Sequence, residues 1–215
     1  PIKCTDQENF AKDTKAALTA AIFQIEEEFL QLSDKNDWGD GTTVVIAVIR
    51  GNQLIVANVG DSECVISSKG KAFPLTEIHN PSKNDKEITR VKKAGGRIHQ
   101  DRVGHPSLNV NYFNLGLSRA IGDDMYKNAR HTDGKPSGVI ADPFVTEIIL
   151  DEEEDDFLIV ACDGLWDVFT HKEAVDFVHK QLRVTEDLNV VCKNLVNEAL
   201  RIGSTDNISA IIATW

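Results

Sequence analysis

The chain has 215 residues, of which 41% are hydrophobic and 27% are charged, so it is long enough for one substantial domain with a hydrophobic core. Its formal net charge of -11 would repel a phosphate backbone, and no cluster of Lys and Arg offsets that balance, which argues against nucleic acid as a partner. The longest apolar run, residues 43–49, is far shorter than the roughly 20 residues that span a bilayer. The sequence therefore predicts neither a membrane segment nor a signal peptide.

The cysteines are widely spaced, and no CxxC pair occurs among Cys4, Cys64, Cys162 and Cys192. This pattern favours reduced thiols over a disulfide framework and predicts a cytoplasmic or nuclear protein. The chain starts at Pro1 and contains Met125 as its one methionine. We therefore expect it to be part of a longer protein.

The first predicted element is a helix over residues 9–32. Its apolar residues follow one another at steps of four and three, which places them on one helical face: Leu18, Ile22, Ile25, Phe29 and Leu32. Two β-rich runs follow, at residues 42–49 and 53–60. The three residues between them, Arg50 to Asn52, suit a hairpin loop, so we expect these two strands to pair antiparallel.

Three further helices are predicted in the rest of the chain. Residues 85–94 have helical character and are followed by two glycines. Thr170 and Glu173 have the spacing of a capping box, which indicates a helix start. A last helical face is formed by Leu188, Val191, Leu195, Ala199 and Ile202, and Gly203 is a suitable stop signal.

Short β-rich runs at residues 64–68, 144–150, 156–162 and 207–215 complete the predicted strands. Strands that pair mainly with their sequence neighbours, and helices grouped at the start and near the end, favour an α+β fold with antiparallel sheets. Residues 100–114 and 127–143 lack a regular pattern and are predicted to be long loops, which are either functional or plain surface excursions. The acidic run 151–156 is predicted to be a solvated turn.

Aspartates stand at the ends of three β-rich runs. Asp61 and Asp163 each follow a run, and Asp206 precedes the last one. Carboxylates held at strand ends can gather at one rim of a sheet, where Mg²⁺ or Mn²⁺ would find the oxygen ligands that these ions prefer. Asp167 could reach the same rim if residues 164–166 turn the chain. Aspartate and glycine are also ordinary turn residues, so the pattern alone is compatible both with a metal site and with simple turns.

Other catalytic and metal-binding motifs are missing from this sequence. The stretch starting at Asp34 superficially suggests a calcium loop, but Trp38 and Val45 occupy its fifth and twelfth positions, which excludes an EF-hand. There is no P-loop, GxGxxG, GxSxG or HExxH motif, and the six histidines do not have the spacing of metal ligands.

Seven stretches, taken in order, resemble the successive motifs of the metal-dependent protein phosphatases (the PPM family) of type 2C. They are "GDGTTVVIAVI", "LIVANVGDSE", "HNPSKNDKEITRVKKAGGRI", "LGLSRAIGDDMYK", "ADPFVTEIIL", "DFLIVACDGLWDVFTHKEAVDFV" and "GSTDNISAIIATW". The resemblance covers nearly the whole chain from about Asp40 to Trp215.

The resemblance implies one phosphatase domain over residues 1–215, built as a four-layer α/β/β/α sandwich of mainly antiparallel sheets flanked by helices. It implies a binuclear Mg²⁺ or Mn²⁺ site with Asp163 and Asp206 as direct ligands. Asp61 and Asp167 would contribute to a weaker third-metal site. Gly164 would let the chain turn beside the metal without a Cβ clash.

The activity implied by the resemblance is hydrolysis of phosphoserine and phosphothreonine on proteins. Two divalent cations would lower the pKa of a bridging water, hold phosphate oxygens and neutralise charge, so no protein nucleophile is required. Residues 79–114 would contain a flap that influences the choice of substrate. We expect a monomer whose partners are phosphorylated proteins.

The chain departs from the family pattern in two places. Neither RxxxED nor DGHGG, the motifs that supply a phosphate-binding arginine and further metal ligands, occurs in the sequence, and Glu63 stands where the family usually has arginine. Three explanations are open. The parent protein contains the upstream motifs, or the motifs were lost and the chain is a pseudophosphatase that binds partners, or the upstream ligands have diverged beyond recognition.

Overall fold

The computed structural model describes residues 13–215, which divide into two compact units. The first unit consists of the chain up to Val44, Ala57–Asp61 and Ile78–Val145. The second unit consists of Val45–Val56, Ser62–Glu77 and Thr146–Trp215.

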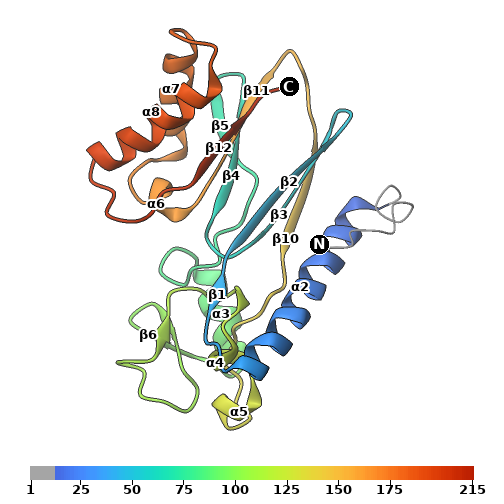
Figure 1. Ribbon diagram of the computed structural model, residues 1–215, viewed down its shortest axis with the longest axis vertical. Coiled ribbons are helices and arrows are strands. Elements are labelled where there is room, and N and C mark those ends of the chain that lie inside the picture. Colours follow the sequence, from blue (N-terminus) through green and yellow to red (C-terminus); the bar gives the residue numbers. More distant parts are fainter. Residues whose placement is uncertain (1–12) are drawn as a thin grey trace. The chain divides into compact units, whose positions relative to one another are not determined.

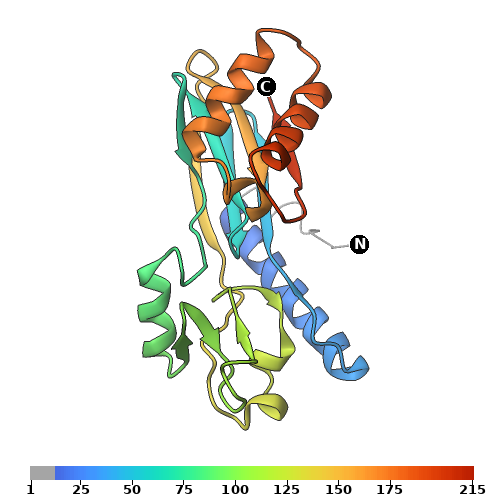
Figure 2. The ribbon, with the colours of Figure 1, turned by 90° about the vertical axis from the view of Figure 1, so that its left-hand side faces the viewer.

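The second unit contains an antiparallel sheet in the order β12-β11-β4-β5. Its strands are β4 (Glu63–Ser68), β5 (Lys71–Pro74), β11 (Asp155–Ala161) and β12 (Ala210–Ala213). A second sheet has the order β10-β3-β2, with β2 (Val44–Arg50), β3 (Gln53–Val59) and β10 (Phe144–Ile149). Helices α7 (His171–Leu182) and α8 (Leu188–Arg201) contact each other. They also contact the sheet β12-β11-β4-β5, α7 at β5 and α8 at β12 (Figures 1 and 2).

Alternation of side chains along β4 and β11 explains why both faces of the first sheet are covered. Val65 and Phe157 belong to a core that the sheet forms with α7 and α8. Their sequence neighbours Ile66 and Leu158 belong to another core, shared with Leu54 of β3. This unit therefore has one helical layer and two sheet layers, and the predicted α+β class with antiparallel sheets is confirmed.

The first unit is built around α2 (Thr14–Asn36) and α3 (Asp85–Lys93). It also contains a small sheet in the order β6-β7-β8 and a pair of short strands, β1 and β9. These elements are β1 (Gly41–Thr42), β6 (Arg97–His99), β7 (Arg102–Gly104), β8 (Asn114–Leu115) and β9 (Ile121–Gly122), followed by the one-turn helices α4 (Asp124–Lys127) and α5 (Ala129–Thr132). Val91, Val103, Tyr126 and Val139 form a core in this unit.

The structure changes the predicted start and apolar face of the first helix. Asp13 caps α2 by accepting a hydrogen bond from Ala16 N, so the helix begins at Thr14, and residues 9–12 of the prediction lie outside the described residues. Leu18 and Ile22 are buried as predicted, whereas Leu32 is 50% exposed.

The predicted hairpin is present, but its loop is shorter than the three residues expected. Only Gly51 and Asn52 separate β2 from β3, because Arg50 continues the strand. Gly51 has φ +56°, a left-handed conformation that glycine adopts without a steric penalty. A two-residue connection joins antiparallel strands, as the sequence predicted.

The two stretches predicted as loops contain short regular elements. Residues 100–114 include β7 and the start of β8, and residues 127–143 include α5. These strands are only two or three residues long, so their side chains show no period-two pattern from which they could be predicted. The acidic run 151–156 forms a turn before β11 begins at Asp155.

Cys64, Cys162 and Cys192 are free thiols, and burial raises the pKa of Cys64 to about 12. In the part of the chain that the structure describes, none of the helices combines the length and the hydropathy that a membrane crossing requires.

A group of charged side chains is enclosed where α2 meets the segment after β9. Glu26 accepts hydrogen bonds from Gly122 N at 2.7 Å and from Lys127 Nζ at 2.5 Å. Asp123 has a left-handed backbone conformation, with φ +55°. Its carboxylate packs against Gly41, and a Cβ on that glycine would lie only 2.2 Å from Asp123 Oδ2. Burial, together with the charges of Glu26 and Asp40, raises the pKa of Asp123 to about 6 against the opposing effect of Lys127.

Replacing Asp123 with Asn should stabilise the protein above pH 6. The pKa of Asp123 is 3.8 in the unfolded chain and about 6 in the folded protein. The free energy of unfolding therefore falls as the pH rises between these two values. Asp123→Asn stays neutral and should raise the free energy of unfolding at pH 7.5 by about 1 kcal/mol, allowing for partial exposure, with a smaller gain at pH 4.5. Urea denaturation at both pH values measures this.

Asp101→Asn is the matched control, because Asp101 is exposed and has a similar left-handed backbone, with φ +57°. An equal gain in both variants would attribute the effect to the backbone preference of Asn and contradict the electrostatic explanation.

Candidate functional site

The first predicted metal ligand lies in the turn that follows β11. After Ala161 the chain passes through Cys162, whose N–H donates to Ser209 O at 3.1 Å, and enters the one-turn helix α6 (Asp163–Trp166). Asp167 N donates to Asp163 O at 2.7 Å, which closes the turn. Residues four apart on a helical turn lie on the same side, so Asp163 and Asp167 occupy neighbouring positions.

A close backbone contact joins this turn to the segment that carries Asp206. A Cβ on Gly164 would lie 2.2 Å from Asn207 O, so only glycine allows this approach. Ser204 Oγ donates to Gly164 O at 2.7 Å, and Ser209 N donates to Cys162 Sγ at 3.2 Å. The structure therefore brings the segment 204–209 beside residues 162–164.

The donor chemistry of this region fits a hard divalent cation. Asp163 is partly buried, and Asp167 and Asp206 are exposed, so all three offer carboxylate oxygens of the kind that Mg²⁺ and Mn²⁺ prefer. Among residues 13–215, however, the structure gathers no group of three or more His, Cys, Asp or Glu side chains that could hold a metal ion. Two carboxylates would leave most positions of an octahedral shell to water.

Asp61, the remaining predicted ligand, lies in the first unit directly after β3. It is 7% exposed, and Asn80 Nδ2 donates to its Oδ2 at 3.0 Å. The preceding Gly60 has φ +102° and exchanges two hydrogen bonds with His79, each 3.1 Å long: Gly60 N donates to His79 Nδ1, and His79 N donates to Gly60 O. The segment His79–Asn80 thus fixes both the backbone and the carboxylate at this strand end.

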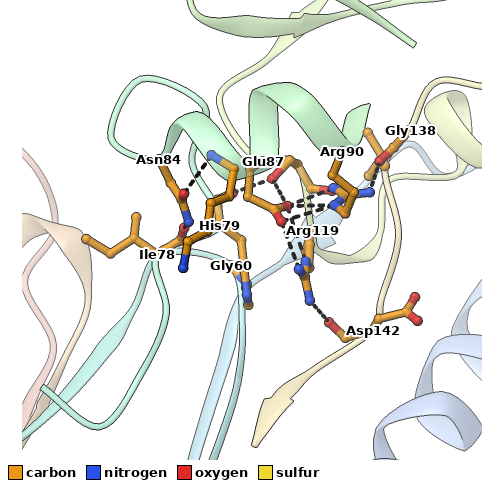
Figure 3. Close-up of polar contacts among 12 residues, drawn as sticks. Gly60, Ile78, His79, Asn84, Glu87, Arg90, Arg119, Gly138 and Asp142 are labelled. Atoms are coloured by element: carbon orange, nitrogen blue, oxygen red, sulfur yellow. Dashed lines mark hydrogen bonds and ion pairs between the residues drawn. The ribbon is translucent and has the colours of Figure 1, made fainter. Parts of the chain in front are cut away.

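A buried ion cluster of Glu87, Arg90 and Arg119 is linked to His79 through Ser118 (Figure 3). Ser118 N donates to His79 O at 2.9 Å, and Ser118 Oγ lies 2.6 Å from Glu87 Oε2. Glu87 lies on α3 with its side chain 3% exposed, and it pairs with Arg90 at 2.8 Å and with Arg119 at 2.8 Å. Burial alone would raise the pKa of Glu87, but hydrogen bonds from Arg119, Arg90 and Ser118 lower it to about 2.

The two arginines of the cluster also bind backbone carbonyls from separate segments. Arg90 donates to Gly138 O at 2.8 Å and to Ser118 O at 2.9 Å, and Arg119 donates to Asp142 O at 2.9 Å. The ionised Glu87 therefore fixes two guanidinium groups that tie α3 to the chain on both sides of β9 (Figure 3).

Sequence reasoning missed this supporting cluster. Arg119 lies in "LGLSRAIGDDMYK", one of the seven stretches that resemble the family, and Glu87 and Arg90 have the (i, i+3) spacing of a helical ion pair. Nothing in that spacing shows that the pair is buried or that a second arginine joins it from 32 residues away in the sequence.

Glu63, the departure from the family pattern, is enclosed in the second unit. It is 4% exposed, and His171 Nε2 at the start of α7 lies 2.9 Å from its Oε2. The ring of His171 packs edge-on against Trp166, with ring centroids 5.2 Å apart. Glu63 is therefore partnered inside the protein and is not a surface carboxylate.

Residues 2–208 match the family described as Protein phosphatase 2C. A probable protein phosphatase 2C 60 of Arabidopsis thaliana is 40% identical over 180 residues, which cover 81% of this chain and 48% of that protein. Protein phosphatase 1A of Bos taurus is 34% identical over 203 residues, which cover 94% of this chain and 51% of that protein. The chain spans about half the length of these curated relatives.

Solved structures agree on the fold. A sex-determining protein of Caenorhabditis elegans matches with a TM-score of 0.77 and 26% identity, over 94% of this chain and 47% of that one. A serine-threonine phosphatase 2C from Toxoplasma gondii matches with a TM-score of 0.73 and 22% identity, over 95% of this chain and 69% of that one. The mixed helical and antiparallel architecture is thus that of a type 2C phosphatase domain. This chain belongs to the protein phosphatase 2C family.

Neutralising Glu87 should destabilise the first unit. Glu87→Gln keeps the shape of the side chain but leaves Arg90 and Arg119 without their counter-ion, and removing one partner of a buried ion cluster costs about 3 kcal/mol. Urea denaturation measures the loss. The exposed Asp85→Asn, in the first turn of the same helix, should cost no more than about 0.5 kcal/mol. Equal losses in the two variants would show that the cluster does not stabilise the fold.

A methyl group at position 164 should separate the two segments that carry Asp163 and Asp206. Gly164→Ala places a Cβ 2.2 Å from Asn207 O, and relieving such an overlap costs about 1–3 kcal/mol although alanine favours the helix of α6. Thermal unfolding checks this against Gly39→Ala, whose Cβ would meet Met125 Sδ at an ordinary 3.5 Å. A Gly164→Ala protein as stable as the Gly39→Ala protein would disprove the close contact.

Proposed function

We propose that this chain forms part of a Mg²⁺- or Mn²⁺-dependent protein serine/threonine phosphatase, in which Asp163 and Asp206 bind the catalytic metal pair. The observation that carries this proposal is the contact of Gly164 with Asn207 O, which sets the turn of Asp163 beside the segment of Asp206. Membership of the protein phosphatase 2C family and the names of its relatives support the same activity.

The chain's own residues would bind the cations and fix the positions of the binding side chains. Asp163 and Asp206 would supply carboxylate oxygens, while Ser204 and Cys162 fix the backbone on either side of the contact. The chemistry that a bound divalent cation supplies is activation of water and neutralisation of charge at the phosphate. A phosphoserine or phosphothreonine side chain of another protein would be the substrate.

Asp167 would contribute to a further, weaker metal site, whereas the part that Asp61 would play stays a prediction from the sequence. Asp167 follows Asp163 by one helical turn, and Asp61 has its carboxylate oriented by Asn80. Because few protein oxygens would hold this ion, we expect it to exchange readily with the solvent.

A catalytically silent protein-binding module on the same fold is the second candidate. The observation that bears on it is Glu63, which stands where the family usually has arginine and lies 2.9 Å from His171 Nε2. Activity measurements distinguish the two candidates.

Removing the charge of Asp163 should weaken metal binding and abolish metal-dependent turnover. In the protein expressed from its complete gene, we expect Asp163→Asn to lower Mn²⁺ affinity at least about tenfold, because neutral Asn replaces an ionised oxygen ligand. Isothermal titration calorimetry measures the affinity, and Mn²⁺-dependent release of phosphate from a phosphothreonine peptide measures the activity.

Asp176→Asn is the matched control, since Asp176 is exposed on α7 and pairs with Lys172. Unchanged metal affinity in Asp163→Asn would refute the ligand assignment. A folded wild-type protein that binds Mn²⁺ but releases no phosphate would favour the protein-binding module.

A further inference from the structure

A groove in the first unit lies between α2 and α4. Its volume is about 450 Å³, and α2 lines it with Phe23, Glu27, Leu30 and Asp34, residues that recur at helical spacing along one stripe. Asp124 and Lys127 of α4 are among the residues of the opposite wall. Phe23 is 42% exposed, so an aromatic ring of this stripe remains accessible to solvent. Figure 1 shows α2 running beside α4, and the two helices are in contact.

The charges around this groove are predominantly negative. Among the residues that the structure describes, its lining contains four carboxylates, Glu26, Glu27, Asp34 and Asp124, but a single cation, Lys127. Lys127 is already paired with Glu26 at 2.5 Å. Arg130 Nη1 lies 3.5 Å from Asp34 Oδ1, and His131 Nε2 lies 3.2 Å from Asp124 Oδ2.

Glu27 is the acidic side chain of the groove with the weakest local compensation. Within residues 13–215 it forms no ion pair, and its one hydrogen bond there comes from Gln31 Nε2 at 3.5 Å. Glu27 is exposed and lies one turn from Phe23 and close to Leu30 on the stripe. An apolar strip with an uncompensated negative edge would complement a segment that presents apolar and cationic side chains together.

We propose that the groove between α2 and α4 docks a basic amphipathic segment of a partner protein, with apolar side chains against Phe23 and Leu30 and a lysine or arginine at Glu27. The spacing of the stripe suits a helical segment, whose anchors recur at the same three- and four-residue steps. The net charge of -11 would also speed the approach of a basic segment. This proposal does not depend on the phosphatase activity.

The test measures the affinity of the full chain for a fluorescein-labelled helical peptide made of leucine and lysine, by fluorescence anisotropy. We expect binding that weakens with added salt, and no binding of a peptide in which glutamate replaces lysine. Glu27→Lys should weaken binding about tenfold, because it places a like charge at the predicted contact. Phe23→Ser, which removes the apolar anchor and keeps the charge, should also weaken it severalfold.

Two matched variants distinguish binding in the groove from a general electrostatic attraction of the peptide to an acidic protein. Glu28→Lys makes the same charge change at the next residue of α2, which does not line the groove, and Leu32→Ser is the counterpart for the apolar change. Both should bind the peptide as the wild type does. All four positions are exposed, so the variants should fold, which circular dichroism checks.

Three results would overturn the proposal. The first is equal weakening by Glu27→Lys and Glu28→Lys, which would mean that the peptide responds only to net charge. The second is equally tight binding of the glutamate peptide. The third is a dimer in sedimentation that Glu27→Lys dissociates, which would assign the groove to a second copy of this chain.

Discussion

Strand β11 has to be covered on both faces, and the second unit is organised by that constraint. Phe157 and Ile159 point into the core shared with α7 and α8, while Leu158 and Val160 pack with the other sheet. A strand this apolar cannot stand at the surface, so a helical layer and a sheet layer have to flank it. The same strand ends at Ala161, and the turn that follows carries Asp163. The apolar pattern thus fixes where the candidate ligand leaves the sheet.

Much of the second unit could be predicted from the sequence because its signals are local. The capping box of Thr170 and Glu173 is present, and Val191, Leu195 and Ala199 are buried on one face of α8 as their spacing indicated. The short strands β6 to β9 could not be predicted, because their pairing depends on partners elsewhere in the chain and on no periodic pattern of their own. The hairpin loop was predicted one residue too long because Arg50, a polar residue, extends β2.

The candidate site shows the same division between local and non-local information. Aspartates at strand ends are visible in the sequence, and the glycine after Asp163 suggests a tight turn. The contact of that glycine with Asn207 links residues more than forty positions apart and is visible only in three dimensions. The same holds for Asp61, whose orientation depends on Asn80, then on His79, and finally on the ion cluster at Glu87. Each of these contacts joins residues that no short motif connects.

The pairing of Glu63 with His171 has an evolutionary consequence. The family usually carries an arginine where this chain has Glu63, and an arginine there would face an imidazole within the same enclosed space. A chain that changed only one of the two residues would hold either a guanidinium without a carboxylate partner or an isolated carboxylate, and both are costly away from water. The two positions should therefore vary together among close relatives of this chain, as one inherited unit, although 108 positions separate them in the sequence.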